Sequence, residues 1–237
     1  MASRKKPVKK YTIKDLLALY DGPHTEKYGE DAPKHLDDLF EETKKEHWDA
    51  SQHTDVKHYE QAWKGFLGSN VEKLLQHILR DKVASFGLDI ADGKSLERKL
   101  AKNLTAEQAA LKQNLSIHYG ALGSVLPDAD IVLYERDTRK VVAVISSKTS
   151  LRERVAQTAY WRVKLASQTS TSHIKTYLFT LDKDGAFRER EAKVKPRMIA
   201  EGELDCTYVM SAEPFEASDK IKPFAHFFDD LRRLVGK

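Results

Sequence analysis

Two short apolar runs separated by a polar segment are the feature that most limits how this chain of 237 residues can fold. The runs cover residues 131–135 and 140–147, and the polar residues 136–139 between them are typical of a hairpin turn. Neither run has the three- to four-residue apolar spacing of a helix. The pattern therefore predicts two paired strands in a buried sheet.

Charged residues stand at the two ends that such a pair of strands would bring together. Asp128 and Asp130 precede the first strand, and Lys148 closes the second. Carboxylates suit a hard cation such as Mg²⁺, which keeps several waters and binds through one or two carboxylates plus substrate phosphates. A lysine beside that ion can orient or deprotonate a water and offset charge on a phosphate. This arrangement is the one expected for metal-dependent phosphodiester hydrolysis.

The first half of the sequence predicts helices, because apolar residues recur there at three- and four-residue spacing. The predicted helices cover residues 13–19, 35–47, 59–66, 71–86 and 95–116. We expect a break at Gly68, after which Ser69 or Asn70 caps the helix that begins at residue 71.

Beyond Gly120 the sequence predicts further strands with helices between them. The expected strands cover residues 174–181 and 206–210, and the expected helices cover residues 151–167 and 224–235. A strand reached through a crossover helix pairs in parallel. The expected fold class is therefore α/β, with a mixed central sheet flanked by helices. We expect a helical N-terminal region over residues 1–118, part of it packing on the core, and the core itself over residues 119–237.

Composition excludes several classes of protein. Cys206 is the single cysteine, so an internal disulfide and a cysteine-based zinc site are excluded, and a reducing cytoplasm is the expected setting. No run approaches the roughly 18 apolar residues of a membrane span. The net charge of +4 conceals basic segments at residues 4–10, 152–164 and 188–197. These segments could contact a phosphate backbone or could be solvated surface.

A specific resemblance begins at the charged ends of the predicted strands. Pro127-Asp128, about twenty residues before Ser146-Ser147-Lys148, resembles the PD-(D/E)XK nuclease motif. The resemblance implies a PD-(D/E)XK core in which an aspartate binds Mg²⁺ and the lysine assists the attacking water.

The residues after the motif make the resemblance narrower. Arg152-Glu153-Arg154 follow Lys148 at the start of the next predicted helix. This order is similar to the type II restriction endonucleases that read CCGG-related sites. Arginine can bond bidentately to guanine O6 and N7, and a carboxylate can accept from cytosine N4. An alternative is that Ser150 and Glu153 form a capping box at the helix start, and both roles could hold in part.

The sequence departs from the nuclease motif at Ser146, where an acidic ligand is expected. In the CCGG-reading enzymes the missing acid comes from the following helix, which here offers Gln157 and its neutral amide oxygen. Glu72, at the start of the preceding apolar helix, stands where related nucleases place an extra acid. The implied metal ligands are Asp128 or Asp130 and the carbonyl of Ser147, with Glu72 or Gln157 in addition.

The sequence leaves the choice between Asp128 and Asp130 open. Residues two apart in an extended chain face the same way, so parity does not separate them. The pairing with Pro127 favours Asp128, and direct adjacency to the strand favours Asp130.

The resemblance implies a type II restriction endonuclease. Such an enzyme uses Mg²⁺ to cleave double-stranded DNA at a short, GC-containing palindromic site. It would act as a homodimer, beside a cognate DNA methyltransferase in the same restriction-modification system. The alternatives are a structure-selective repair nuclease or junction resolvase of the same fold, a DNA-binding protein that has lost catalysis, and a helical interaction protein.

Overall fold

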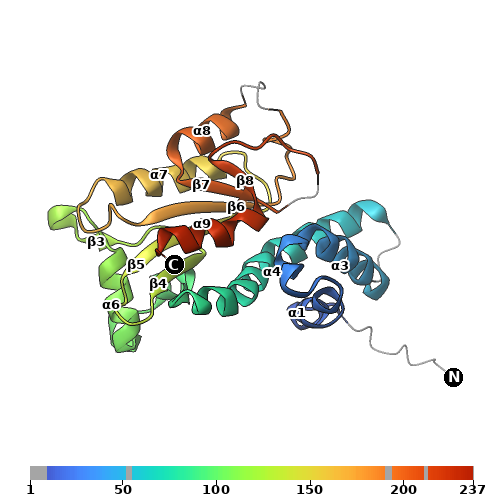
Figure 1. Cartoon of the computed structure of the whole chain (residues 1–237), viewed down its shortest axis with the longest axis horizontal. Helices are drawn as coiled ribbons and strands as arrows, with labels where there is room; N and C mark the ends of the chain where they lie inside the picture. Colours follow the sequence, from blue (N-terminus) through green and yellow to red (C-terminus); the bar gives the residue numbers. More distant parts are fainter. Residues whose placement is uncertain (1–9, 52–54, 190–193, 211–212, 237) are drawn as a thin grey trace. The chain divides into compact units, whose positions relative to one another are not determined.

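The protein is described here from a computed structural model, which describes residues 10–51, 55–189, 194–210 and 213–236 (Figure 1). The chain divides into two compact units, Met1–His77 and Ile78–Lys237. The boundary falls inside a long helix, α4 (Val56–Ser85). Each unit is considered by itself below.

The first unit is helical, as the sequence predicts. It contains α1 (Ile13–Leu19), α3 (Leu36–Ala50) and most of α4, with shorter helical turns between the first two. The turns are η1 (Tyr20–His24), α2 (Thr25–Tyr28) and η2 (Gly29–Lys34). The predictions of helices over residues 13–19 and 35–47 are confirmed.

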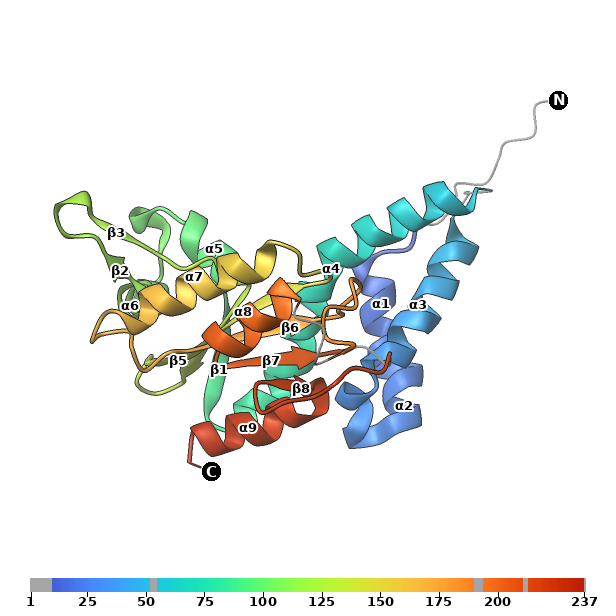
Figure 2. The same ribbon diagram turned by 90° about the horizontal axis from the view of Figure 1, so that it is seen from above.

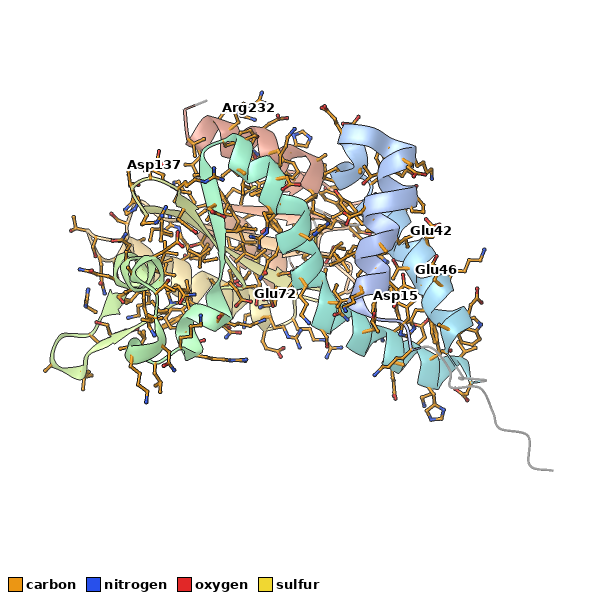
Figure 3. All side chains as sticks on the ribbon, turned by 90° about the horizontal axis from the view of Figure 1, so that it is seen from below. Asp15, Glu42, Glu46, Glu72, Asp137 and Arg232 are labelled. Atoms are coloured by element: carbon orange, nitrogen blue, oxygen red, sulfur yellow. The ribbon has the colours of Figure 1, made fainter. Side chains whose placement is uncertain are left out.

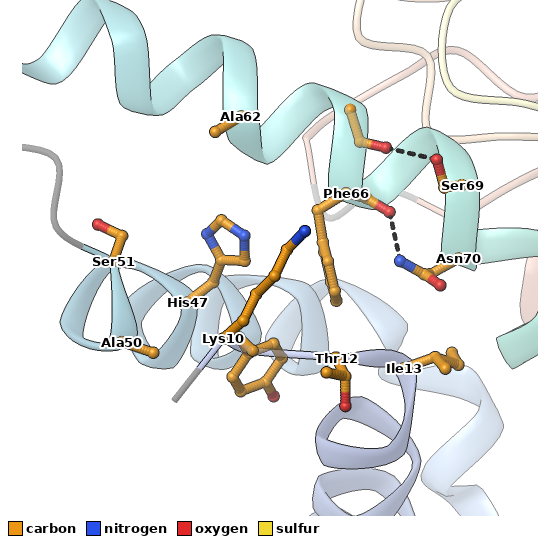
Figure 4. A pocket seen from close by; sticks show the side chains of 12 residues that line it. Lys10, Thr12, Ile13, His47, Ala50, Ser51, Ala62, Phe66, Ser69 and Asn70 are labelled. Atoms are coloured by element: carbon orange, nitrogen blue, oxygen red, sulfur yellow. Dashed lines mark hydrogen bonds between the residues drawn. The ribbon is translucent and has the colours of Figure 1, made fainter. Parts of the chain in front are cut away.

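The predicted break at Gly68 is wrong, because α4 runs through it without interruption. The Ser69 Oγ donates to the Gly65 carbonyl and the Asn70 Nδ2 donates to the Phe66 carbonyl, both at 2.8 Å (Figure 4). These side chains therefore bond back to the preceding turn of the same helix instead of capping a new one. Burial of apolar side chains keeps the helix continuous. The buried residues follow one another at helical spacing across this segment: Tyr59, Trp63, Leu67, Val71, Leu74, Leu75 and Ile78.

The second unit contains a six-stranded mixed sheet, and the predicted fold class is confirmed. In spatial order the strands are β1 (Leu88–Asp92), β4 (Ile131–Glu135), β5 (Val141–Lys148), β6 (Lys175–Thr180), β7 (Cys206–Val209) and β8 (Ile221–Pro223). The β1–β4 and β4–β5 pairings are antiparallel, and the β5–β6, β6–β7 and β7–β8 pairings are parallel. The crossover from β5 to β6 runs through α7 (Arg154–Ala166), as expected.

Several elements of the second unit were not predicted. The strand β1 was missed because its five residues carry only two buried apolar side chains, Leu88 and Ile90, in alternation with less buried residues. The predicted helix over residues 95–116 is two helices, α5 (Gly93–Arg98) and α6 (Ala106–Leu115), with the turn η3 (Ala101–Asn103) between them. A small separate hairpin pairs β2 (Ile117–His118) with β3 (Ser124–Val125) around the turn η4 (Gly120–Leu122). The predicted domain boundary at residue 118 falls inside this unit.

Helices cover both faces of the sheet in the second unit (Figures 1 and 2). Leu178 and Val209 pack into one apolar cluster with residues of α7 and α8 (Lys195–Glu203). On the opposite face the rings of Phe179 and Tyr208 contact Phe227. Phe227 begins α9 (Phe227–Leu234), which follows the turn η5 (Phe224–His226) in the region predicted to be a closing helix.

One of the predicted basic segments has a structural role. Arg197 is 2% exposed, so its guanidinium does not face solvent. Its Nη1 donates to the Phe187 carbonyl at 3.1 Å, and its Nη2 donates to Glu201 Oε1 at 3.0 Å and to the Glu216 carbonyl at 2.9 Å. A buried arginine held in this way is not available to a phosphate backbone, which corrects the expectation for this residue.

Within the described part of the chain, no helix is both long enough and apolar enough to cross a membrane.

The N-terminus of α5 packs closely against the segment that leads into β4. The Gly93 amide donates to the Asp130 carbonyl at 3.2 Å. A Cβ added at Gly93 would lie well inside contact distance of the Ala129 carbonyl oxygen. Glycine is therefore required at this position for close approach of the two backbone segments.

Gly93→Ala is expected to lower the free energy of unfolding by about 1–3 kcal/mol, because the backbone at Ala129 must move to admit the methyl group. Gly202→Ala in α8 is the matched control, since a Cβ there meets no atom within 4 Å. The control should be neutral or stabilising by up to about 1 kcal/mol. Urea unfolding of the three proteins measures both effects, and equal losses in both variants would contradict the packing argument.

Candidate active site

Asp130 and Lys148 meet at the ends of two paired strands. The antiparallel register of β4 and β5 sets Ile131 opposite Ile145, and the Asp130 amide donates to the Ile145 carbonyl at 2.9 Å. The Asp130 Oδ2 accepts from the Ser147 amide at 2.6 Å and from the Lys148 Nζ at 3.1 Å. Strand pairing thus brings the predicted carboxylate and ammonium together.

A second lysine, which the sequence analysis missed, completes the surroundings of Asp130. The Nζ of Lys94 lies 2.7 Å from the Asp130 Oδ1. Lys94 follows the unpredicted strand β1 and stands in the first turn of α5. The alternation of apolar and polar residues in β1 was the signal that could have placed it.

The electrostatic setting of Asp130 is that of a buried, ionised carboxylate. The side chain is 1% exposed, and burial by itself would raise its pKa. The nearby charge of Lys148, together with Lys94 and the Ser147 amide, outweighs this effect and lowers the pKa below its ordinary value. The carboxylate therefore carries its charge at neutral pH.

Asp128 lies in a different environment from Asp130. Its Oδ2 accepts from the Gln157 Nε2 of α7 at 2.7 Å. Its carbonyl accepts from the Oγ of Ser146 at 3.4 Å, and Ser146 is buried. Gln157, the predicted ligand from α7, is exposed, and it contacts one of the two candidate aspartates.

The Arg152-Glu153-Arg154 triplet is exposed on the segment that follows Lys148. The helix α7 begins only at Arg154, with Glu153 at the N-cap position in a helical conformation (φ −74°, ψ −13°) and without a side-chain capping bond. A capping box requires Ser150 at the N-cap position, and Glu153 occupies that position. The capping-box alternative is therefore wrong.

Two hydrogen bonds of Leu151 anchor the turn that carries the triplet. Leu151 is fully buried, and its amide donates to the Asp184 Oδ2 at 2.9 Å. Its carbonyl accepts from the Arg154 amide at 2.7 Å. Arg152, between Leu151 and Arg154, has φ +36°, in the left-handed region that non-glycine residues seldom occupy. The exposed side chains are therefore held on a constrained backbone.

Comparison with known proteins identifies the family of the chain. Residues 107–233 match the family model described as BsaWI restriction endonuclease type 2. This range includes the two aspartates, Lys148 and the triplet. The chain belongs to this family of type II restriction endonucleases. It is a site-specific nuclease that acts on DNA.

Two relatives carry descriptions that match this family. A protein of Methanocaldococcus jannaschii described as "Putative type II restriction enzyme MjaVIP" is 35% identical over 182 residues, which are 75% of this chain and 78% of that protein. A Helicobacter pylori protein described as "Probable type II restriction enzyme HpyAORF263P" is 36% identical over 133 residues, or 55% of this chain and 64% of that protein. The solved structure "Restriction endonuclease PspGI-substrate DNA complex" aligns with a TM-score of 0.44 at 14% identity, covering 94% of this chain and 80% of that one.

The residues around Asp130 are of a kind that fits Mg²⁺. Across the described residues, no group of three or more histidine, cysteine, aspartate or glutamate side chains forms a closed metal cage. Mg²⁺ does not need one, since it binds through one or two carboxylates and completes its shell with water and phosphate oxygens. The carboxylate of Asp130 is ionised, so its oxygens are of the kind that binds a hard cation.

Glu72 lies in the first unit, on α4 (Figure 3). Its Oε1 accepts from the Gln76 Nε2 one turn along the same helix, at 3.4 Å. The predicted ligand roles of Glu72, Gln157 and the Ser147 carbonyl remain predictions.

A pocket in the first unit is chemically unlike the site at Asp130. It is lined by aromatic, small and polar side chains, among them His47, Phe66 and Asn70 (Figure 4). Its lining includes neither a carboxylate nor any of the predicted site residues. This pocket therefore has no part in the proposed chemistry.

Asp130→Ala is expected to lower the free energy of unfolding by about 1.5–3 kcal/mol in EDTA, because it removes the hydrogen bonds from Lys148 and the Ser147 amide and the ion pair with Lys94. Asp128→Ala removes one bond to a neutral amide and should lower it by about 1 kcal/mol or less. Urea unfolding followed by tryptophan fluorescence measures both changes. A larger loss for Asp128→Ala would show that Asp128, and not Asp130, is the carboxylate whose interactions contribute more to stability.

Proposed function

We propose that this enzyme hydrolyses double-stranded DNA at a short, GC-containing palindromic site related to CCGG, with Mg²⁺ as its cofactor. The observation that carries the proposal is the convergence of Lys148 and the Ser147 amide on buried Asp130. The exposed Arg152-Glu153-Arg154 turn begins four residues after Lys148, which supports base recognition beside this site.

The chemistry at the site rests on charge placement. Asp130 or Asp128, with the Ser147 carbonyl, would hold Mg²⁺, and Gln157, which contacts Asp128, would be an additional ligand. When bound, the ion supplies Lewis-acid stabilisation of charge on the phosphate and on the leaving 3′ oxygen. The Lys148 ammonium would donate a hydrogen bond that orients the attacking water and would offset charge on the phosphate, while Asp130 fixes the position of this ammonium. The neutral Ser146 adds no charge to the site.

Recognition is assigned to the exposed triplet. Arg152 and Arg154 would donate bidentately to guanine O6 and N7 in the major groove, and Glu153 would accept from cytosine N4. The anchors at Leu151 and Asp184 limit the motion of the turn, so these side chains are held ready for base contacts.

The proposed assembly follows from the symmetry of the substrate. A palindromic site is matched most simply by a two-fold homodimer in which each subunit cuts one strand. The helical region over residues 1–118 is proposed to supply dimer contacts and to grip the DNA backbone. A cognate DNA methyltransferase in the same restriction-modification system and a cytoplasmic setting complete the proposal.

Digestion of a sequenced plasmid by the purified enzyme with Mg²⁺ tests the function. We expect discrete fragments, and we expect their loss with EDTA and with Lys148→Ala, because the first removes the ion and the second removes the group that acts on water. Sequencing the fragment ends gives the site. A uniform smear would favour a structure-selective or nonspecific nuclease, and DNA binding without cleavage would favour a protein that has lost catalysis.

Arg152→Ala and Arg154→Ala test recognition on the site found in that way. Each variant is expected to lose about 1–3 kcal/mol of discrimination between the cognate site and a site changed at one base pair. The measurement is kcat/KM on the two DNA duplexes. Arg136→Ala is the control, because this exposed arginine lies in the β4–β5 turn, at the opposite ends of the strands from Lys148. Figure 3 labels Asp137 of the same turn. Unchanged discrimination in both triplet variants would remove the triplet from recognition.

A further inference from the structure

Each carboxylate oxygen of Asp130 contacts a lysine, and the two lysine side chains differ in their exposure to solvent. Lys148 contacts Oδ2, which also accepts from the Ser147 amide, and its side chain is 15% exposed. Lys94 contacts Oδ1 at 2.7 Å, and its side chain is 41% exposed. The Lys94 side chain is therefore the more accessible of the two to solvent and to an incoming ion.

The backbone that carries Lys94 is fixed, so its ammonium returns to one place. The Asp92 Oδ1 accepts from the Ser95 amide at 2.6 Å and caps α5. Gly93 is packed against Ala129 and is bonded to the Asp130 carbonyl. Lysine is a compact charge on a flexible four-carbon stem. A rigid backbone and a mobile stem are the properties of a reversible internal counter-ion.

We propose that Lys94 is a built-in counter-ion of Asp130 that a divalent metal ion displaces, so that Lys94 sets the affinity of the DNA-free enzyme for its metal. A Mg²⁺ ion lies about 2.0–2.1 Å from a ligand oxygen. An ammonium on the same Oδ1 would lie against the ion and repel it, so the two cations compete for this oxygen. This inference rests on the proposed metal-binding role of Asp130.

The test is a titration with Mn²⁺, which takes the same oxygen ligands as Mg²⁺, in the absence of DNA. Electron paramagnetic resonance reports the free ion. Lys94→Met is expected to bind Mn²⁺ at least about tenfold more tightly than the wild-type enzyme, because binding no longer breaks a charged hydrogen bond. Lys94→Arg keeps the charge and should bind close to wild type.

Lys102→Met is the matched control for net charge, because Lys102 is an exposed lysine of η3 in the same unit. It should leave the affinity for Mn²⁺ unchanged. Thermal unfolding in EDTA verifies that every variant is folded. If Lys94→Met lowers the Tm but binds Mn²⁺ as the wild type does, Lys94 only stabilises the fold and the inference is overturned.

Asp130→Asn separates this inference from the proposed function. Loss of Mn²⁺ binding in Asp130→Asn, with tighter binding in Lys94→Met, supports both. Loss in Asp130→Asn with wild-type binding in Lys94→Met overturns only the role of Lys94. Wild-type binding in Asp130→Asn would show that the metal role of Asp130 is itself wrong.

Discussion

A carboxylate removed almost wholly from water is stable only where cations and hydrogen-bond donors take the place of that water, and Asp130 imposes this condition on the strands around it. The register of β4 against β5 supplies the Ser147 amide and Lys148 at one oxygen. The pairing of β1 with β4 carries α5 to the same place and supplies Lys94 at the other. The proposed metal-binding role of Asp130 therefore depends on the same strand pairings that stabilise its buried charge.

The short chain segment after β5 links this charge to the recognition turn. Three residues separate Lys148 from Arg152. The turn is also held by Asp184, which follows β6 and accepts a hydrogen bond from the Leu151 amide. Because β5 and β6 are parallel neighbours, the two anchoring segments leave the sheet at the same end. The proposed contacts with bases and the proposed chemistry on the phosphate would thus be held by one rigid strand pair.

The candidate site was predictable where it depends on local pairing. Asp130 and Lys148 meet because two strands joined by a short turn can pair in only a few registers, and the apolar pattern selects one. Lys94 could not be found in the same way, since its position depends on a strand about forty residues upstream of β4 whose short alternation is a weak signal. The buried contacts of Arg197 likewise depend on segments distant in sequence, so its basic character gave no sign of them.

The amino-acid sequence by itself determined the mixed α/β class, the β4–β5 hairpin, the crossover helix and the meeting of a carboxylate with Lys148. These features follow from apolar periodicity and from residues close together along the chain. The tertiary structure decided that α4 is unbroken at Gly68, that α7 begins at Arg154 and that Asp128 and Asp130 have different partners. Each of these outcomes depends on which side chains are buried against distant segments, and burial outweighs local capping and turn preferences when the two compete.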